Sequence, residues 1–362
     1  MQYKENGLRM PDLFTSPLAS ALWRLDGWQM LGALFTMPWV SLVVAAIIAC
    51  GICVFPGRRA QRESRMRPGA ATAGGVVARY SREHRTLGLT AIGVVVVFLA
   101  ENLISGYVLD LNGVISWWRY AMPVFTASVG IGLLLAIVAT LGSTPPERPV
   151  AVPRRTWLTF SPRAGTAGAA LAVLALTATT VLAGLASSNI NGGPYVFLEI
   201  EINNEPIDPL RPWFYGWAYG IPVLICTAVL LAVMVAALHA SAVRPFLRPE
   251  TVAAEQRERR DVATAITRTA TSALLLTLAG AWRFIADAGS VVGLTVQRDG
   301  GSDSYTAFWR YGEIAAVGGG LAPLLEIAAF VLLFLVIAQL YPRDHGARTG
   351  TEAESPADSE AV

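Results

Sequence analysis

The stretch from Trp309 to Tyr341 reads WRYGEIAAVGGGLAPLLEIAAFVLLFLVIAQLY. It is apolar almost throughout, with aromatic residues at both ends and the carboxyl group of Glu326 near its middle. A helix needs about 20 apolar residues to cross a bilayer core, and tryptophan and tyrosine rings favour the interfaces on either side. The stretch therefore predicts a transmembrane helix with one ionisable group deep inside the membrane.

Six further stretches share this length and apolar character. Hydrophobic residues make up 54% of the chain and charged residues 15%, whereas about 25% of the residues in a soluble domain are charged. We predict an all-α polytopic membrane protein with one membrane domain at 29–341. Its seven transmembrane helices are expected at 30–55, 86–108, 119–142, 166–187, 215–241, 264–289 and 313–341.

A short aromatic motif recurs where every second predicted span begins. Its four copies read Trp23-Arg24-Leu25, Trp118-Arg119-Tyr120, Trp217-Ala218-Tyr219 and Trp309-Arg310-Tyr311. The tryptophans are separated by 95, 99 and 92 residues, and each copy is followed by an apolar run and a break rich in proline and arginine. The pattern predicts about 3.5 tandem copies of one helix pair.

The distribution of arginine predicts the orientation of the helices. The connections 56–85, 143–165 and 242–268, with the tail 342–362, hold 20 of the 28 lysines and arginines, and the positive-inside rule makes them cytoplasmic. With seven spans, the N-terminus then lies outside and the C-terminus inside. We expect an external segment at 1–28 containing a candidate interfacial helix, and a disordered cytoplasmic tail at 342–362. The arginine-rich, lysine-poor composition suggests a bacterial cytoplasmic membrane.

The predicted outer loops carry short strand patterns. Residues 195–203 alternate in polarity, with one side formed by Val196, Leu198, Ile200 and Ile202 and the other by Glu199 and Glu201. Shorter runs at 107–113 and 293–297 also lie beside Asn, Asp or Gly, which are turn residues. We expect these three loops to form one small β element on the outer face.

Ionisable groups inside the membrane are the best local indication of function, because a charge at the bilayer centre costs roughly 2.5–3.5 kcal/mol on insertion scales. We predict that a substrate or ion pathway is lined by Glu326, Arg283, Asp287, Glu101 and Asn102. A proline three residues before Glu326 should kink its helix. The alternative is a structural network between helices, in which Glu326 is a protonated hydrogen-bond donor and Glu101 pairs with Arg283.

Three of the aromatic motifs contain an arginine. If Arg24, Arg119 and Arg310 surround one outer vestibule, their charges favour an anionic group there. The alternative is that the motifs only anchor helix ends at the membrane interface.

Several kinds of chemistry leave no mark on the sequence. Cys50 and Cys53 form a single CxxC, and there is no HExxH metal motif, phosphate-binding glycine loop or nucleophile elbow. We therefore expect no metal site, no cofactor and no enzymatic activity. The basic connections are assigned to topology and to anionic lipid, and not to nucleic acid.

Two functions remain. The first is a transport permease, or the membrane subunit of a multi-chain transporter, surrounded by the lipid bilayer and working with a separate cytoplasmic ATPase or regulatory subunit. The second is a non-transporting receptor, regulatory or scaffold protein that presents its outer loops to a ligand and its arginine-rich inner loops to a partner. Spans interrupted by glycine and proline, with an ionisable group near the midplane, favour the first.

Overall fold

The computed structural model describes residues 37–54, 70–103, 116–141, 156–202, 208–246, 248–291, 293–298 and 301–340. The predictions made for residues 1–28, for Arg24, for the loop 107–113 and for the tail 342–362 lie outside these ranges.

Helices dominate the described residues. In chain order they are α3 (Pro38–Val54), α5 (Ala70–Leu103), α6 (Met122–Leu141), α7 (Arg163–Ala186), α8 (Trp217–Val243), α9 (Val252–Gly289) and α10 (Gly312–Ile337), with the short 3-10 helix η3 (Pro249–Thr251) before α9. Six of these helices are long and apolar enough to cross a membrane, and α3 is a shorter apolar helix. By the length and composition of its helices, the chain is a multi-span integral membrane protein.

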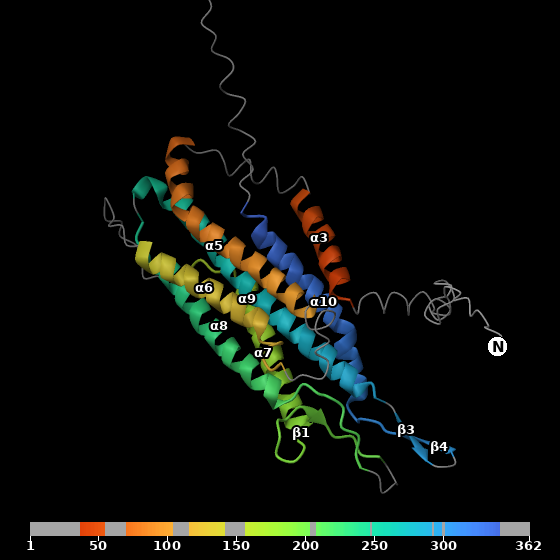
Figure 1. Ribbon diagram of the computed structural model, residues 1–362. Coiled ribbons are helices and arrows are strands. Elements are labelled where there is room, and N and C mark those ends of the chain that lie inside the picture. Colours follow the sequence, from red (N-terminus) through yellow and green to blue (C-terminus); the bar gives the residue numbers. More distant parts are fainter. Residues whose placement is uncertain are drawn as a thin grey trace, which may run out of the picture.

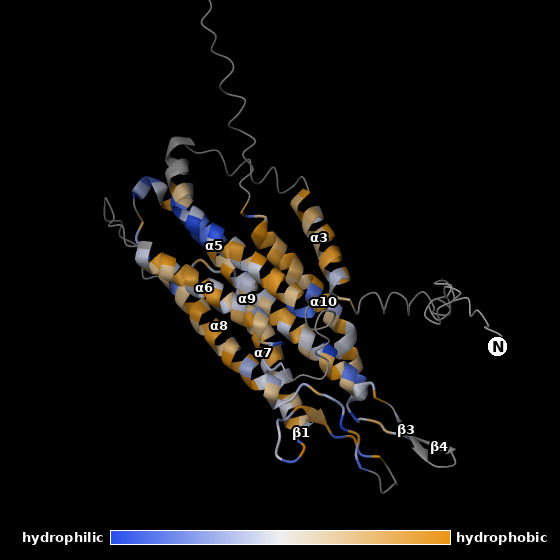
Figure 2. Ribbon diagram, viewed as in Figure 1, coloured by the Kyte–Doolittle hydropathy of each residue, from blue (hydrophilic) through white to orange (hydrophobic). Residues whose placement is uncertain are grey.

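Each predicted span coincides with a helix, but two helices begin much earlier than predicted. α5 begins at Ala70 instead of residue 86, and α9 begins at Val252 instead of residue 264. At a rise of about 1.5 Å per residue, their 34 and 38 residues give lengths of roughly 51 and 57 Å, beyond a hydrocarbon core of about 30 Å. The prediction followed hydropathy, whereas the described part of the additional turns is largely hydrophilic (Figure 2).

α9 occupies the middle of the bundle. It packs against α5, α6, α7, α8 and α10 (Figure 1), and protein buries 83% of its membrane window, compared with 33–44% for the other five long helices. Its buried face is rich in alanine and in hydroxyl groups; Thr267 and Ser272, for example, donate to carbonyl oxygens one turn earlier in the helix. Small side chains and satisfied hydroxyls let several helices approach α9 closely.

The three described aromatic motifs come together at one end of the bundle. α6, α8 and α10 all begin toward the end that carries the β-strands, and we call this the strand end (Figure 1). The rings of Tyr120 and Tyr219 are 5.5 Å apart between centroids, and those of Phe214 and Trp309 are 5.7 Å apart. The helices therefore alternate in direction from α5 to α10. The tandem repeat and the side of the membrane that each end faces stay predictions.

The strands differ from the single β element expected. β1 (Ser187–Ser188) pairs with β2 (Phe197–Leu198), while β3 (Gly293–Arg298) pairs with β4 (Gly301–Thr306) in a separate antiparallel hairpin. The expectation was wrong because the partner of each strand is a neighbouring segment of the chain, and not another loop. The alternation at 195–203 is confirmed: the buried side chains are those of Val196, Leu198, Ile200 and Ile202, and the exposed ones are Glu199 and Glu201.

Glycines set the closest contacts between helices. A Cβ at Gly319 would lie 2.6 Å from the methyl group of Ala286, so only glycine allows α10 to approach α9 at this point. α10 also runs without interruption from Gly312 to Ile337 through Pro323. A kink at Pro323 therefore stays a prediction, and Gly319 serves packing.

Candidate functional site

A cavity of about 370 Å³ opens among the helices at the strand end. All five residues predicted to line a pathway lie on its wall. The complete lining is Phe98, Glu101, Asn102, Ser116, Arg119, Tyr120, Met122, Pro123, Trp213, Tyr219, Leu276, Thr277, Gly280, Arg283, Phe284, Asp287 and Glu326. These residues come from α5, α9, α10, the starts of α6 and α8, and the segments that precede α6 and α8, so the cavity exists only in the folded bundle.

Glu326 and Arg283 form a two-pronged ion pair across the contact between α9 and α10. Nε of Arg283 donates to Oε1 of Glu326 at 2.7 Å, and Nη2 donates to Oε2 at 2.8 Å. The Glu326 side chain is 2% exposed, and that of Arg283 is 22% exposed. This fork-to-fork geometry is that of a carboxylate, and charge-assisted bonds of this kind are the strong ones. Arg283 thus satisfies Glu326 and presents part of its guanidinium group to the cavity.

Other predicted residues surround this pair. Asn102 is half-buried near the end of α5 and donates to the carbonyl oxygen of Phe98 at 2.8 Å. Glu101 lies beside it on the cavity wall. Asp287 is one turn beyond Arg283 on α9, as their spacing predicts, and its side chain is more exposed. The structure therefore brings together residues from three helices that are far apart in the sequence.

An aromatic cluster forms one wall of the cavity, and the sequence reasoning missed it. The Tyr120 ring stacks on Phe284, with centroids 5.6 Å apart, and meets Tyr215 and Tyr219 edge-on at 5.4 and 5.5 Å. Thr277 also donates to the backbone carbonyl of Tyr120 at 3.1 Å. Burial raises the pKa of the Tyr120 and Tyr215 phenols above its usual value, so both stay neutral.

The tyrosine at the third position of the aromatic motif was the sequence feature that could have predicted this cluster. Tyr120 and Tyr219 were interpreted as interface anchors, but both line the cavity. Tyr311, in the same position of the last motif, is 42% exposed. Copies of one motif thus differ in their surroundings, because a tyrosine at a helix start can point toward lipid or toward a neighbouring helix.

The predicted vestibule arginines do not all line this cavity. Arg119 does, with its guanidinium carbon 5.9 Å from the centroid of Tyr120. Arg310 is exposed, stacks on the neighbouring Tyr311 ring at 4.5 Å, and is not among the lining residues. Since Arg24 lies outside the described residues, a vestibule formed by all three arginines stays a prediction.

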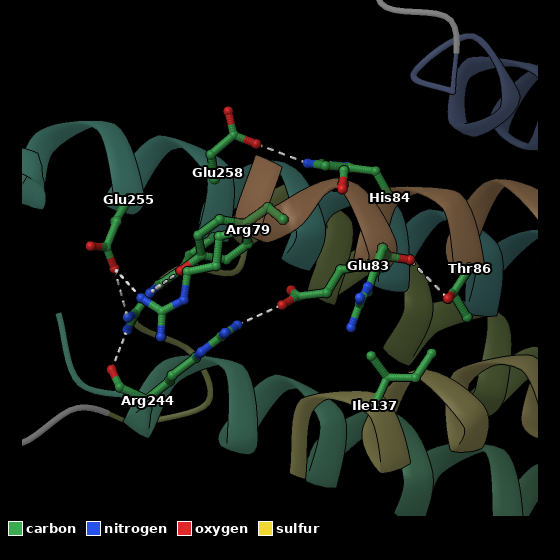
Figure 3. A network of polar contacts seen from close by, with 12 residues as sticks. Arg79, Glu83, His84, Thr86, Ile137, Arg244, Glu255 and Glu258 are labelled. Carbon is green, nitrogen blue, oxygen red and sulfur yellow. Dashed lines mark hydrogen bonds and ion pairs between the residues drawn. The ribbon is translucent and has the colours of Figure 1, made fainter. Parts of the chain in front are cut away.

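A second polar cluster lies at the opposite end of the bundle, where α5, α8 and α9 meet (Figure 3). We call it the arginine network, and it comprises Arg79, Tyr80, Glu83, Arg244, Glu255 and Arg259. The arginines of this region were predicted to contact anionic lipid and to set the topology. The expected lipid contact is wrong for Arg244 and Arg259, which are 8% and 0% exposed and are enclosed by protein, whereas their part in the topology stays a prediction.

Arg259 holds the C-terminal end of α8. Its Nη1 donates to the carbonyl oxygens of Ala242 at 3.3 Å and Arg244 at 2.7 Å, and its Nη2 donates to that of Pro245 at 3.2 Å. Its Nε donates to the Tyr80 hydroxyl at 3.0 Å, which links this cap to α5. The last carbonyl groups of a helix have no amide partner within the helix. Here the guanidinium group supplies the hydrogen-bond donors that the amides of a further turn would have supplied.

Two carboxylates complete the network and join three helices. Glu83 on α5 accepts a 2.6 Å hydrogen bond from Arg244, just beyond the end of α8. Glu255 on α9 accepts from Arg79 and from Arg259, each at 3.4 Å. Figure 3 shows the Glu83 and Glu255 side chains pointing toward these arginines from opposite helices. The spacing of Glu255 and Arg259, four residues apart on one helix, was the available sequence signal.

Among the described residues, no group of three His, Cys, Asp or Glu side chains is placed to hold a metal ion. The three cysteines are free thiols, and Cys50 is exposed on α3.

Neither the family models, nor the curated proteins, nor the solved structures that were compared with this chain give a match. Function is consequently inferred from the cavity and the arginine network themselves.

Proposed function

We propose that this chain is a membrane permease, or the membrane subunit of a multi-chain transporter, and that the cavity at the strand end is its solute site. The observation that carries the proposal is a cavity of about 370 Å³ that reaches the Glu326–Arg283 pair between α9 and α10. Ligand sites are typically concave, largely apolar, and supplied with a few convergent polar groups. This cavity is concave and has such convergent polar groups beside an aromatic wall, but its lining is richer in charged and polar side chains than that pattern.

The two ends of the bundle differ in a way that suits transport. The strand end contains the cavity, whereas at the other end the arginine network joins α5, α8 and α9, and His84 pairs with Glu258 at 2.9 Å. In alternating access, each conformation of a transporter is open at one side of the membrane and closed at the other. With the strand end outside, as the arginine distribution predicts, this state would be open toward the exterior of a bacterial cytoplasmic membrane.

The arrangement of charge also supports a solute site. An ion pair inside a membrane domain loses solvation, and replacing such a pair by apolar residues is often neutral or stabilising. α9 and α10 already pack through small residues such as Gly319 and Ala286. The Glu326–Arg283 pair lies at the cavity, and the packing of α9 against α10 does not depend on it. This supports a role of the pair in binding a solute or in coupling its movement to that of an ion.

The second candidate is a receptor that binds a ligand in the same cavity without moving it across the membrane. The arginine network favours this reading, because Arg259 is 0% exposed and bridges α8, α5 and α9. Opening this end would break several charge-assisted hydrogen bonds at once. A receptor would keep them, and a permease would exchange them during its cycle.

Flux measurements separate the two candidates. Purified protein in phosphatidylglycerol liposomes is tested on a solid-supported membrane with concentration jumps of protons, amino acids, short peptides, organic anions and organic cations. We expect a transient current with at least one solute, and we expect Glu326→Gln to abolish it. Glu313→Gln is the matched control, because Glu313 is exposed in the first turn of the same helix.

A double variant distinguishes loss of function from loss of fold. Glu326→Gln removes the charge from the carboxylate that Arg283 holds through two hydrogen bonds, which is destabilising. Arg283→Met combined with Glu326→Met removes both charges and should recover the melting temperature while the current stays absent. A retained current in the double variant would exclude the pair from the mechanism, and saturable binding without any current would favour the receptor.

A further inference from the structure

The cavity contains two opposite charges that the Glu326–Arg283 pair does not use. Arg119 and Asp287 both line it, and neither has an ion-pair partner among the residues that the structure describes. The remaining charged lining residue, Glu101, has a partner of its own. One guanidinium group and one carboxylate are therefore available to a ligand.

These two charges lie near the same aromatic wall. Arg119 is 5.9 Å from the centroid of the Tyr120 ring, and the charges of Arg119 and Asp287 act on the Tyr120 phenol in opposite directions. The stacked Phe284 ring and the edge of Tyr219 continue the wall. An apolar body lying on these rings would place one end toward a cation and the other toward an anion, and ring faces also attract ammonium groups.

The balance of charge argues against a simple anion site. The lining holds two arginines, Arg119 and Arg283, against three carboxylates, Glu101, Asp287 and Glu326. A ligand carrying only negative charge would meet the carboxylate of Asp287, and a ligand carrying only positive charge would meet the guanidinium group of Arg119. The vestibule predicted to favour anions therefore becomes, at this cavity, a site with both signs.

We propose that the cavity binds a small zwitterion with an apolar or aromatic body, its carboxylate or phosphate directed to Arg119 and its ammonium group to Asp287. This inference rests on the proposed function for the location of the site and adds the class of ligand. A cavity of about 370 Å³ is large enough for a free amino acid or a dipeptide. The headgroup of a zwitterionic phospholipid has the same chemistry.

Three probes with the same ring test the class. L-Phenylalanine carries both charges, phenethylamine only the ammonium group, and 3-phenylpropanoate only the carboxylate; leucyl-phenylalanine adds a zwitterion with more widely separated charges. Binding is measured by titration calorimetry on the protein in phosphatidylglycerol nanodiscs. We expect one of the two zwitterions to bind at least about tenfold more tightly than either single-charge analogue.

Matched variants assign each charge. Arg119→Gln should remove the advantage of the zwitterion over phenethylamine, and Asp287→Asn should remove its advantage over 3-phenylpropanoate. Arg310→Gln is the control, because Arg310 is exposed and does not line the cavity. Equal losses for all probes in both variants would show that the two residues only hold the fold, and would overturn the proposal.

The source of the zwitterion is resolved by lipid composition. If the ligand is a lipid headgroup, native mass spectrometry of protein taken from mixed phosphatidylethanolamine and phosphatidylglycerol membranes should show retained phosphatidylethanolamine, reduced by Arg119→Gln and by Asp287→Asn. Absence of both zwitterion binding and retained phosphatidylethanolamine overturns the ligand class. Binding of the zwitterion without uptake of the radiolabelled zwitterion into proteoliposomes overturns the permease and leaves the ligand class standing, whereas uptake of single-charge solutes alone does the reverse.

Discussion

Arg259 shows that a residue whose sequence context predicts exposure to solvent can be buried and can hold helices together. It lies in a run of charged residues, Arg257 to Arg260, that hydropathy assigns to a cytoplasmic connection. In the structure its side chain is 0% exposed, donates to three carbonyl oxygens and a phenol, and lies 4.4 Å from the centroid of the Phe246 ring. A buried charge is tolerated because nearly all of its donors are used.

We predict that Arg259→Ala destabilises the protein by about 3–5 kcal/mol, because it removes one of the partners of the buried Glu255 carboxylate and leaves the carbonyl groups at the end of α8 without the guanidinium group that caps them. The measurement is the melting temperature of detergent-purified protein by intrinsic fluorescence. Arg260→Ala is the matched control, since the next residue along α9 is exposed and should tolerate the change. Equal melting temperatures for both variants would show that the network contributes no stability.

At the scale of single residues, the sequence revealed charges inside the membrane but not those at its inner edge. Glu326, Arg283 and Asp287 stand alone in apolar runs, so their isolation was visible and the cavity lining contains them. Arg244 and Arg259 occur among other arginines, and nothing in a single sequence distinguishes a solvated arginine from a buried one. Glu83, the partner of Arg244, comes from a segment 161 residues earlier, a pairing that periodicity cannot predict.

One glycine on α7 allows α8 to pack closely against it. A Cβ at Gly184 would lie 2.5 Å from the Trp217 indole, so the ring that begins α8 packs directly on the α7 backbone. Opposite this contact, α7 exposes large leucines such as Leu171 and Leu185, at 68% and 72% exposure, as expected for a face in contact with lipid. The tryptophan of the third motif is thus a packing residue between helices.

We predict that Gly184→Ala lowers stability by about 1–3 kcal/mol, because an added methyl group must displace the indole or separate the helices. Gly168→Ala, on the same helix, is the control; a Cβ there meets nothing within 4 Å, and alanine is the better helix former. Thermal unfolding of the two variants should therefore shift in opposite directions or leave Gly168→Ala unchanged. A Gly184→Ala variant as stable as the wild type would contradict this packing.

Element positions were largely predictable, whereas element ends and strand partners were not. Apolar length located each of the seven spans, but α5 and α9 continue into charged turns that have no hydropathy signal. Alternation identified the buried side of 195–203 correctly. It could not show that β3 pairs with β4, since pairing depends on which backbone lies next to which in space.

At the scale of the whole molecule, the chain combines alternating helices with two chemically different ends. The strand end holds aromatic rings and the cavity, and the other end holds the arginine network (Figures 1 and 3). The positive-inside rule assigns the arginine-rich end to the cytoplasm. Composition yields a prediction of the orientation, but it could not predict the cavity, because the wall of the cavity is assembled from segments that only the fold brings together.

The orientation gives a direct prediction. Alkaline phosphatase fused after Val362 should be inactive in a bacterial host, and green fluorescent protein at the same point should fluoresce, because the positive-inside rule predicts that the C-terminus is cytoplasmic. A phosphatase inserted between Arg298 and Gly301, where β3 and β4 pair, should instead be active. The reverse pattern at these two positions would place the strand end in the cytoplasm and would invert the proposed direction of access.

The most direct test of the account is whether water reaches the cavity from outside. Asn102→Cys, in a chain whose Cys50, Cys53 and Cys226 are replaced by serine, places one thiol on the cavity wall. A membrane-impermeant methanethiosulfonate added to intact cells should modify it, while Leu171→Cys on the lipid-facing side of α7 should stay unmodified. An Asn102→Cys thiol as unreactive as the Leu171→Cys thiol, or reactive only after the cytoplasmic side is opened, would contradict a solute site open to the exterior.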